Sequence, residues 1–213
     1  MTPEEIGALN NKYFAEEGYV FPGHFEHRFD FTSSAYMYSM IRKYKPTTAM
    51  HIGTWEGGSA CIIVAALLKN GKKFKYTASE LLDDKREHAQ THVLEQTGYK
   101  PKMIGDITKN LRRVPREIDF LFVDTDHDLE TTEWIFKKIM PRVKKGSLVI
   151  FHDWAVEEMP DGSLNGKGDE GEGGWPETNW MMDEYKNGTL PLKKIFWTFN
   201  NPDRQETAFW EKI

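Results

Sequence analysis

The fold of this 213-residue chain can be worked out from one stretch of its sequence, Thr48-Ala49-Met50-His51-Ile52-Gly53-Thr54-Trp55-Glu56-Gly57-Gly58-Ser59. Its first five residues predict a short strand, which runs into a glycine turn at Gly53. Residues 57–70 are rich in apolar side chains and are followed by Gly71, a pattern typical of a helix and its C-terminal cap. A strand, a glycine turn and a helix in this order predict the start of a β–α–β unit.

The alternation of strands and helices continues along the chain as far as residue 151. The predicted elements are, in chain order, residues 73–79, 84–97, 102–104, 107–113, 118–123, 129–140 and 147–151, beginning with a strand. Such alternation predicts right-handed crossovers and a parallel sheet. The strand at 118–123 is apolar throughout, as burial of both faces of a parallel sheet requires.

Further elements are expected at both ends of this pattern. Two helices precede it, and Ser33 or Ser34 caps the second of them, which ends at Lys45. A helix and two strands follow it, at residues 178–185, 192–199 and 207–213. The turn between the two strands is short, which favours an antiparallel hairpin. The predicted fold is therefore α/β: a Rossmann-like three-layer sandwich, with a mostly parallel sheet and a C-terminal antiparallel hairpin.

Length and composition favour one folded, cytoplasmic domain. The 39% of hydrophobic and 29% of charged residues argue against disorder. The single cysteine, Cys61, lies in an apolar run, which predicts a buried thiol and excludes an intramolecular disulfide. That run is too short to cross a bilayer, and residues 1–5 lack the apolar region of a signal peptide, so we expect no membrane partner. The sequence leaves the oligomeric state open, a homo-oligomer included.

The formal net charge is -5, and its acidic excess lies in one segment. Residues 156–176 contain six acids and one lysine, so the acids and bases of the remaining chain balance. The segment is rich in glycine and has little to bury, and we expect a mobile lid or a disordered insertion there. A mild acidic surplus without a long basic stretch does not favour a nucleic-acid partner.

Candidate ligand-binding residues follow the ends of the first three strands. They are Gly53, Thr54 and Ser59 in the glycine turn, Glu80 after the second strand and Asp106 after the third. Ligands of open parallel sheets bind beyond these strand ends, and a helix N-terminus offers free N–H groups to an anion. The turn is neither the G-x-G-x-x-G dinucleotide motif nor a P-loop. Taken singly, the glycine turn is also consistent with a tight turn without a ligand, Glu80 with a surface acid, and Asp106 with a helix cap.

Taken together, the series resembles class I S-adenosylmethionine (SAM)-dependent methyltransferases, from about residue 31 to the C-terminus. The resemblance implies SAM as cofactor, with Gly53 and Ser59 near its methionine moiety. It further implies that Glu80 binds the ribose and that Asp106 lies near the adenine, with Thr54 also at the cofactor.

Two residues depart from or extend this resemblance. Many relatives carry an acid at the position of His51, where it approaches the amino group of the methionine moiety. Either His51 substitutes for that acid or another residue does so. Ser33, together with Thr32 and Ser34, is similar to residues that contact the methionine end of the cofactor in related small-molecule enzymes.

Acids and histidines follow two further strands, as Asp124-Thr125-Asp126-His127 and as His152-Asp153. These resemble the Asp-x-x-His and His-Asp motifs of macrolide-sugar O-methyltransferases and cephalosporin hydroxylase-like proteins, and the metal site of catechol-type enzymes. The resemblance implies a magnesium ion bound to substrate hydroxyl oxygens. We place Asp124, His152 and Asp153 as its ligands; a histidine ligand admits manganese or iron.

The same segments supply the candidate catalytic residues, Asp124 and His127. An unperturbed histidine pKa near 6.5 suits His127 as general base toward a hydroxyl. Other interpretations stay open: Asp126 or Asp128 caps the next helix, and His152 merely orients Asp153. The pair His88 and His92, four residues apart on a helix, is interpreted as a solvated face.

The sequence therefore predicts a single methyltransferase domain. Its parts are an N-terminal helical and aromatic segment, a cofactor-binding core, the acidic loop, and a C-terminal helix with the hairpin, at residues 1–46, 47–155, 156–176 and 177–213. The expected reaction is SAM-dependent, metal-assisted methyl transfer to a hydroxyl of a small molecule, such as a sugar, a polyol or a natural product. The alternatives are a non-catalytic nucleotide-binding protein and an NAD-dependent oxidoreductase.

Overall fold

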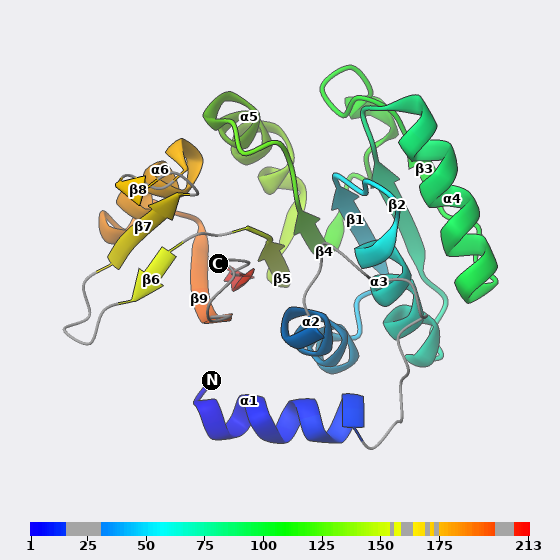
Figure 1. Cartoon of the computed structure of the whole chain (residues 1–213), viewed down its shortest axis with the longest axis horizontal. Helices are drawn as coiled ribbons and strands as arrows, with labels where there is room; N and C mark the ends of the chain where they lie inside the picture. The colour runs from blue at the N-terminus through cyan, green and yellow to red at the C-terminus, as the bar shows by residue number, and fades with distance from the viewer. Residues whose placement is uncertain (16–30, 154–155, 159–163, 169–170, 173–174, 199–206) are drawn as a thin grey trace.

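A computed structural model describes residues 1–15, 31–153, 156–158, 164–168, 171–172, 175–198 and 207–213 (Figure 1). Its main sheet has seven strands in the order β3-β2-β1-β4-β5-β10-β9. The strands are β1 (Thr48–Ile52), β2 (Lys75–Ser79), β3 (Lys102–Ile104), β4 (Ile118–Val123), β5 (Val143–Phe151), β9 (Leu192–Thr198) and β10 (Thr207–Lys212). The α-helices are α1 (Pro3–Asn10), α2 (Phe31–Tyr44), α3 (Gly58–Lys69), α4 (Asp83–Thr97), α5 (Leu129–Lys138) and α6 (Pro176–Lys186).

The sheet has the predicted mixture of strand directions. Strands β1 to β5 pair in parallel, whereas β10 is antiparallel to both β5 and β9. From β1 the chain builds outward through β2 to β3, and then returns to add β4 and β5 on the other side of β1. This reversal opens a crevice at the carboxyl ends of β1 and β4, which is where open α/β sheets bind ligands.

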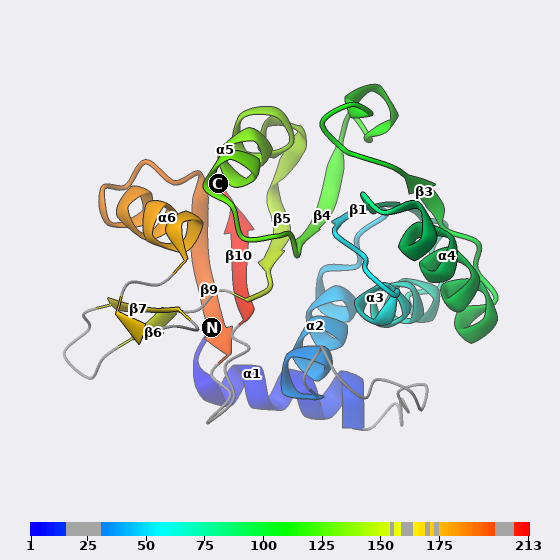
Figure 2. The ribbon, with the colours of Figure 1, turned by 45° about the horizontal axis from the view of Figure 1, so that its top comes forward.

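Helices cover both faces of the sheet and complete three layers (Figure 2). Phe120 and Phe122 of β4 pack into one buried cluster with α2 and α3, and Leu121 and Val123 pack into a second cluster with α5 and α6. The alternation follows the two-residue period of a strand, and it confirms the predicted sandwich. Cys61 of α3 is buried as expected, and burial raises the pKa of its thiol to about 12.

The second helix begins earlier than predicted. Helix α2 starts at Phe31, so Ser33 and Ser34 lie inside it, and their predicted role as caps is wrong. Ser33 is fully buried, and its Oγ lies 3.1 Å from Oγ1 of Thr198 in β9. A tertiary hydrogen bond to the far hairpin therefore replaces the local capping bond that the sequence favoured.

The acidic glycine-rich segment contains regular structure that the sequence did not predict. Strands β6 (Val156–Glu158), β7 (Leu164–Gly168) and β8 (Gly171–Glu172) form a small antiparallel sheet. The acidic loop expected at 156–176 therefore includes this ladder, and its role as a lid stays a prediction. Backbone hydrogen bonds hold a ladder without the apolar side chains on which the sequence interpretation relied.

No helix among the described residues has the length and apolar character to cross a membrane.

Candidate active site

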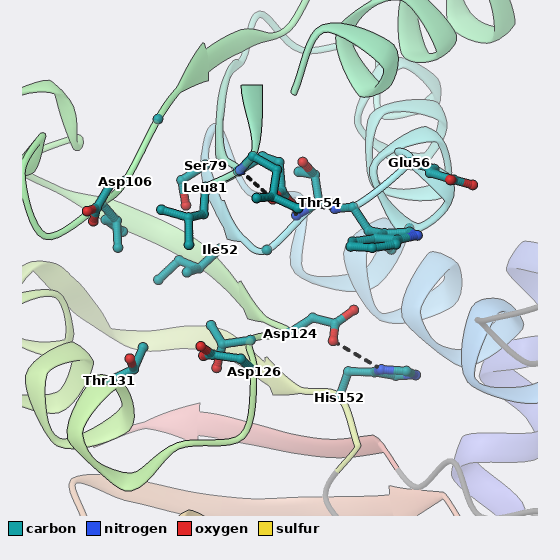
Figure 3. A pocket seen from close by; sticks show the side chains of 18 of the residues that line it. Ile52, Thr54, Glu56, Ser79, Leu81, Asp106, Asp124, Asp126, Thr131 and His152 are labelled. Atoms are coloured by element: carbon teal, nitrogen blue, oxygen red, sulfur yellow. Dashed lines mark hydrogen bonds and ion pairs between the residues drawn. The ribbon is translucent and has the colours of Figure 1, made fainter. Parts of the chain in front are cut away.

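A cavity of about 1080 Å³ opens at the predicted edge of the sheet (Figure 3). Nine of the predicted site residues line it: Gly53, Thr54, Ser59, Glu80, Asp106, Asp124, His127, His152 and Asp153. Ligand pockets commonly measure about 300–1,000 Å³. The cavity is therefore large enough for a sizeable cofactor and a second small molecule.

The glycine turn packs directly on the end of β4. The N–H of Gly53 donates to the carbonyl oxygen of Ser79, 3.0 Å away, and its backbone adopts φ 81°. A Cβ atom at Gly53 would overlap the carbonyl oxygen of Asp124. Only glycine fits here, because both the φ angle and the contact exclude a side chain.

Trp55, in the same turn, is a non-glycine residue with φ 46° that remains 39% exposed at the cavity. The ammonium of Lys85 lies 4.4 Å from the centre of its ring and 2.6 Å from a carboxylate oxygen of Glu56. A left-handed backbone at a bulky residue is uncommon and tends to occur at functional sites.

Glu80 holds the glycine turn through its carboxylate. Its Oε2 accepts hydrogen bonds from the N–H groups of Thr54 and Trp55, at 3.2 and 2.7 Å, and its Oε1 accepts one from Leu82, at 3.1 Å. The residue is only 7% exposed, although it lines the cavity. Glu80 thus fixes the shape of the cavity wall, a role that the ribose-binding prediction did not include.

Asp106 closes a turn after β3. Its Oδ1 accepts from the N–H and the hydroxyl of Thr108, at 2.9 and 2.6 Å. These bonds, with the help of Lys109, lower the pKa of Asp106. The predicted helix at 107–113 is correspondingly reduced to this turn and a short 3-10 helix, Leu111–Arg113. Local side-chain bonds compete with helix formation at such positions.

His51 and Ser33 are not among the residues that line the cavity, and their placement at a cofactor stays a prediction. His51 is fully buried beneath the turn, with Nδ1 2.7 Å from the Tyr76 hydroxyl and Nε2 3.5 Å from Oγ of Ser59. Burial lowers the pKa of His51 to about 4, so the imidazole is neutral. Its contact with Ser59 joins it to a residue that lines the cavity, whereas Ser33 bonds to Thr198.

The acid and histidine segments converge after β4 and β5. One ligand atom each of Asp124, His152 and Asp153 lies within 4.8 Å of the others. Nδ1 of His152 is 3.5 Å from Oδ1 of Asp124 and 3.3 Å from Oδ1 of Asp153, and Figure 3 shows Asp124 and His152 pointing toward one another. Burial opposes a charge on His152, but the two carboxylates outweigh it and raise its pKa to about 10. Two carboxylates and an imidazole are a donor set that fits a divalent cation.

His127 lies between two carboxylates. Its Nε2 is 3.2 Å from Oδ2 of Asp153, and its Nδ1 is 3.1 Å from Oε1 of Glu177 in α6. Burial opposes protonation, but the hydrogen bonds to both acids outweigh it and raise the pKa of His127 to about 9. Each ring nitrogen of His127 therefore faces a carboxylate oxygen, and its role as general base stays a prediction.

Several residues at the site were missed or misinterpreted from the sequence. Glu177 had no local signal beyond the helix start at Pro176. His88 is exposed and His92 is half-buried, in agreement with a solvated face, and both also line the cavity from α4 with ring centroids 6.1 Å apart. Their spacing of four residues had already placed them on one helix face. Asp128 does cap α5, as one interpretation held, by accepting a 2.7 Å bond from the N–H of Thr131.

The sequence matches a family described as a methyltransferase domain over residues 50–154. The match includes the glycine turn, Glu80, Asp106 and both acid and histidine segments. This segment of the chain is thus similar to methyltransferase domains. Among curated protein sequences, none matches this chain.

The methyltransferase fold is shared with solved structures of low sequence identity. An O-methyltransferase from Bacillus cereus, in complex with SAH, has a TM-score of 0.63 and 13% identity, and the alignment covers 100% of this chain and 92% of that one. TomG from Streptomyces achromogenes, an O-methyltransferase of tomaymycin synthesis in complex with SAM, has a TM-score of 0.65 and 13% identity, covering 100% and 91%. SAH-bound PaMTH1 from Podospora anserina has a TM-score of 0.59 and 15% identity, covering 99% and 89%.

Proposed function

We propose that this protein transfers a methyl group from SAM to a hydroxyl group of a small molecule, with the help of a divalent metal ion. One observation carries the proposal: the glycine turn with Glu80 and the Asp124, His152 and Asp153 cluster line the same cavity. The Bacillus and Streptomyces structures with this fold are O-methyltransferases in complex with SAH and SAM. We further propose that residues 1–213 act as a single domain.

The cavity wall fits a cofactor with a carboxylate and further polar groups. Gly58 and Ser59, in the first turn of α3, line the cavity, and first-turn N–H groups are suited to an anionic carboxylate. Oγ1 of Thr54 is buried at this wall and has no hydrogen-bond partner among the described residues. A buried hydroxyl without a partner is costly, and a polar ligand would satisfy it.

The acidic cluster fits a metal ion beside the acceptor. Asp124, His152 and Asp153 would hold the ion, and when bound it would lower the pKa of a substrate hydroxyl. We propose magnesium, with manganese and iron as the alternatives that the imidazole admits. Thr125, Asp126 and Thr131 add polar groups to this side of the cavity and favour a hydroxylated acceptor, such as a sugar, a polyol or a natural product. The remaining task of the chain is to align acceptor and methyl donor.

Calorimetric titration with S-adenosylhomocysteine (SAH) tests the proposal. We expect SAH to bind, and we expect a panel of sugars, polyols and catechols to include an acceptor that yields SAH from SAM. Addition of EDTA should suppress turnover, and Mg²⁺ or Mn²⁺ should restore it. Absence of binding at high micromolar SAH would contradict the whole proposal. Turnover that persists in EDTA would contradict only the metal.

Replacement of Glu80 by alanine is expected to weaken SAH binding by at least about tenfold. The carboxylate holds three N–H groups of the cavity wall, and one hydrogen bond to a charged group contributes about 1.5–3 kcal/mol. Titration of Glu80→Ala with SAH measures the effect. Asp84→Ala, an exposed acid on α4, serves as the control. Equal affinities in the two variants would show that Glu80 does not shape the cofactor site.

A further inference from the structure

His127 is held by contacts on three sides. One ring nitrogen faces Asp153, the other faces Glu177, and the ring stacks on Trp175 at a centroid distance of 4.9 Å and an interplanar angle of 24°. The backbone of His127 is left-handed, with φ 58°, which costs about 1–3 kcal/mol at a non-glycine residue. The fold therefore keeps this imidazole in place against its own backbone preference.

Glu177 is buried although it lies in the first turn of a helix. It is 7% exposed, and its Oε1 is 3.1 Å from Nδ1 of His127. Its Oε2 has no hydrogen-bond partner among the described residues. A surface acid would serve the helix dipole equally well without the cost of desolvation. The contact with His127 is thus the feature that accounts for a buried acid at this position.

Asp153 is the residue on which these contacts converge. Its Oδ2 is 3.2 Å from Nε2 of His127, and its Oδ1 is 3.3 Å from Nδ1 of His152. With both oxygens engaged, the carboxylate has one orientation, and Oδ1 faces the cluster with Asp124. Groups that hydrogen-bond to a ligating carboxylate fix its orientation, and their loss typically reduces metal affinity 10–100-fold.

We propose that Glu177 and His127 are positioning residues, which act in series to hold Asp153 in its metal-binding orientation. Helix α6 thereby supports the metal site, although it contributes no ligand to it. The inference rests on the proposed metal site and goes beyond it, because it gives His127 a role other than that of general base and gives Glu177 a role.

Calorimetric titration of the full chain with Mn²⁺ tests the proposal, without the need for an acceptor. We expect Glu177→Ala to weaken Mn²⁺ binding 10–100-fold. Glu177→Gln should retain nearly wild-type affinity, because an amide oxygen still accepts a hydrogen bond from Nδ1. Asp183→Ala, an exposed acid on the same helix, is the matched control and should bind as wild type does. Thermal unfolding of each variant verifies the fold.

A double-mutant cycle shows whether Glu177 acts on Mn²⁺ binding through His127 or independently of it. His127→Phe keeps the stacking on Trp175 but removes both nitrogens, and it remains informative if Glu177→Ala does not fold. We expect the double variant with Glu177→Ala or Glu177→Gln to bind Mn²⁺ no more weakly than His127→Phe alone. Equal affinity of wild type, Glu177→Ala and His127→Phe would overturn this inference and leave the metal site intact. A wild-type protein that binds no Mn²⁺ would overturn the metal site, and the inference with it.

Discussion

Gly53→Ala is expected to abolish the folded state, or to lower the free energy of unfolding by more than about 4 kcal/mol. The added Cβ would overlap the carbonyl oxygen of Asp124, which is fixed by the β4 strand. The φ angle of 81° adds the penalty of a left-handed conformation, about 1–2 kcal/mol. The contact lies between two backbone segments at the carboxyl ends of β1 and β4, so no flexible side chain can move aside. Thermal unfolding followed by circular dichroism measures the loss.

Gly71→Ala provides the matched control for this prediction. Gly71 has φ 67°, but a Cβ there would meet nothing within 4 Å. The control therefore carries the backbone penalty alone, and its Tm should fall by only a few degrees. If both variants unfold at similar temperatures, the packing of the turn on β4 is not what requires glycine at position 53.

Asp153→Asn is expected to reduce turnover by about 100- to 1,000-fold and to eliminate Mn²⁺ binding. A metal ion contributes several kcal/mol to such a transition state, and each 1.36 kcal/mol is a factor of ten in rate. Asparagine is nearly isosteric and tolerates the left-handed backbone at this position, where φ is 51°, so the variant should fold. Formation of SAH with the best acceptor of the panel measures turnover, and calorimetry measures Mn²⁺ binding.

The charge-matched control is Asp84→Asn, on the exposed side of α4. Its turnover should stay within about twofold of wild type, since surface substitutions away from a site have small effects. Two outcomes would contradict the role of Asp153. One is turnover of Asp153→Asn at the control level, and the other is unchanged Mn²⁺ binding.

The fold was predictable because its signals are local. Apolar strands end in glycines or acids, helices end in glycine, and their alternation prescribes a parallel sheet. The sheet order follows from that alternation, and it brings Gly53, Glu80, Asp106, Asp124 and Asp153 to one edge. Residues at strand ends could therefore be assigned to a common site without any knowledge of their contacts.

The remaining parts of the site depend on contacts between distant segments. Glu177 follows His127 by 50 positions, and Thr198 follows Ser33 by 165, so neither pairing has a local pattern. The direction of a side chain was a second difficulty: His51 lies at the expected strand position, yet its ring contacts Tyr76 and Phe122 and is not among the side chains that line the cavity. Sequence spacing places a residue in the sheet, but the packing of neighbours decides its role.

The left-handed conformations of Trp55, His127 and Asp153 have a consequence for the evolution of the protein. All three line the same cavity, whereas Lys45, the other described non-glycine residue with positive φ, lies outside it. Glycine or asparagine at these positions would relax the backbone and increase thermal tolerance. Selection for thermal stability alone would therefore favour substitutions at these cavity-lining positions. A thermostable descendant of this chain would gain its stability most safely at positions far from the carboxyl edge of the sheet.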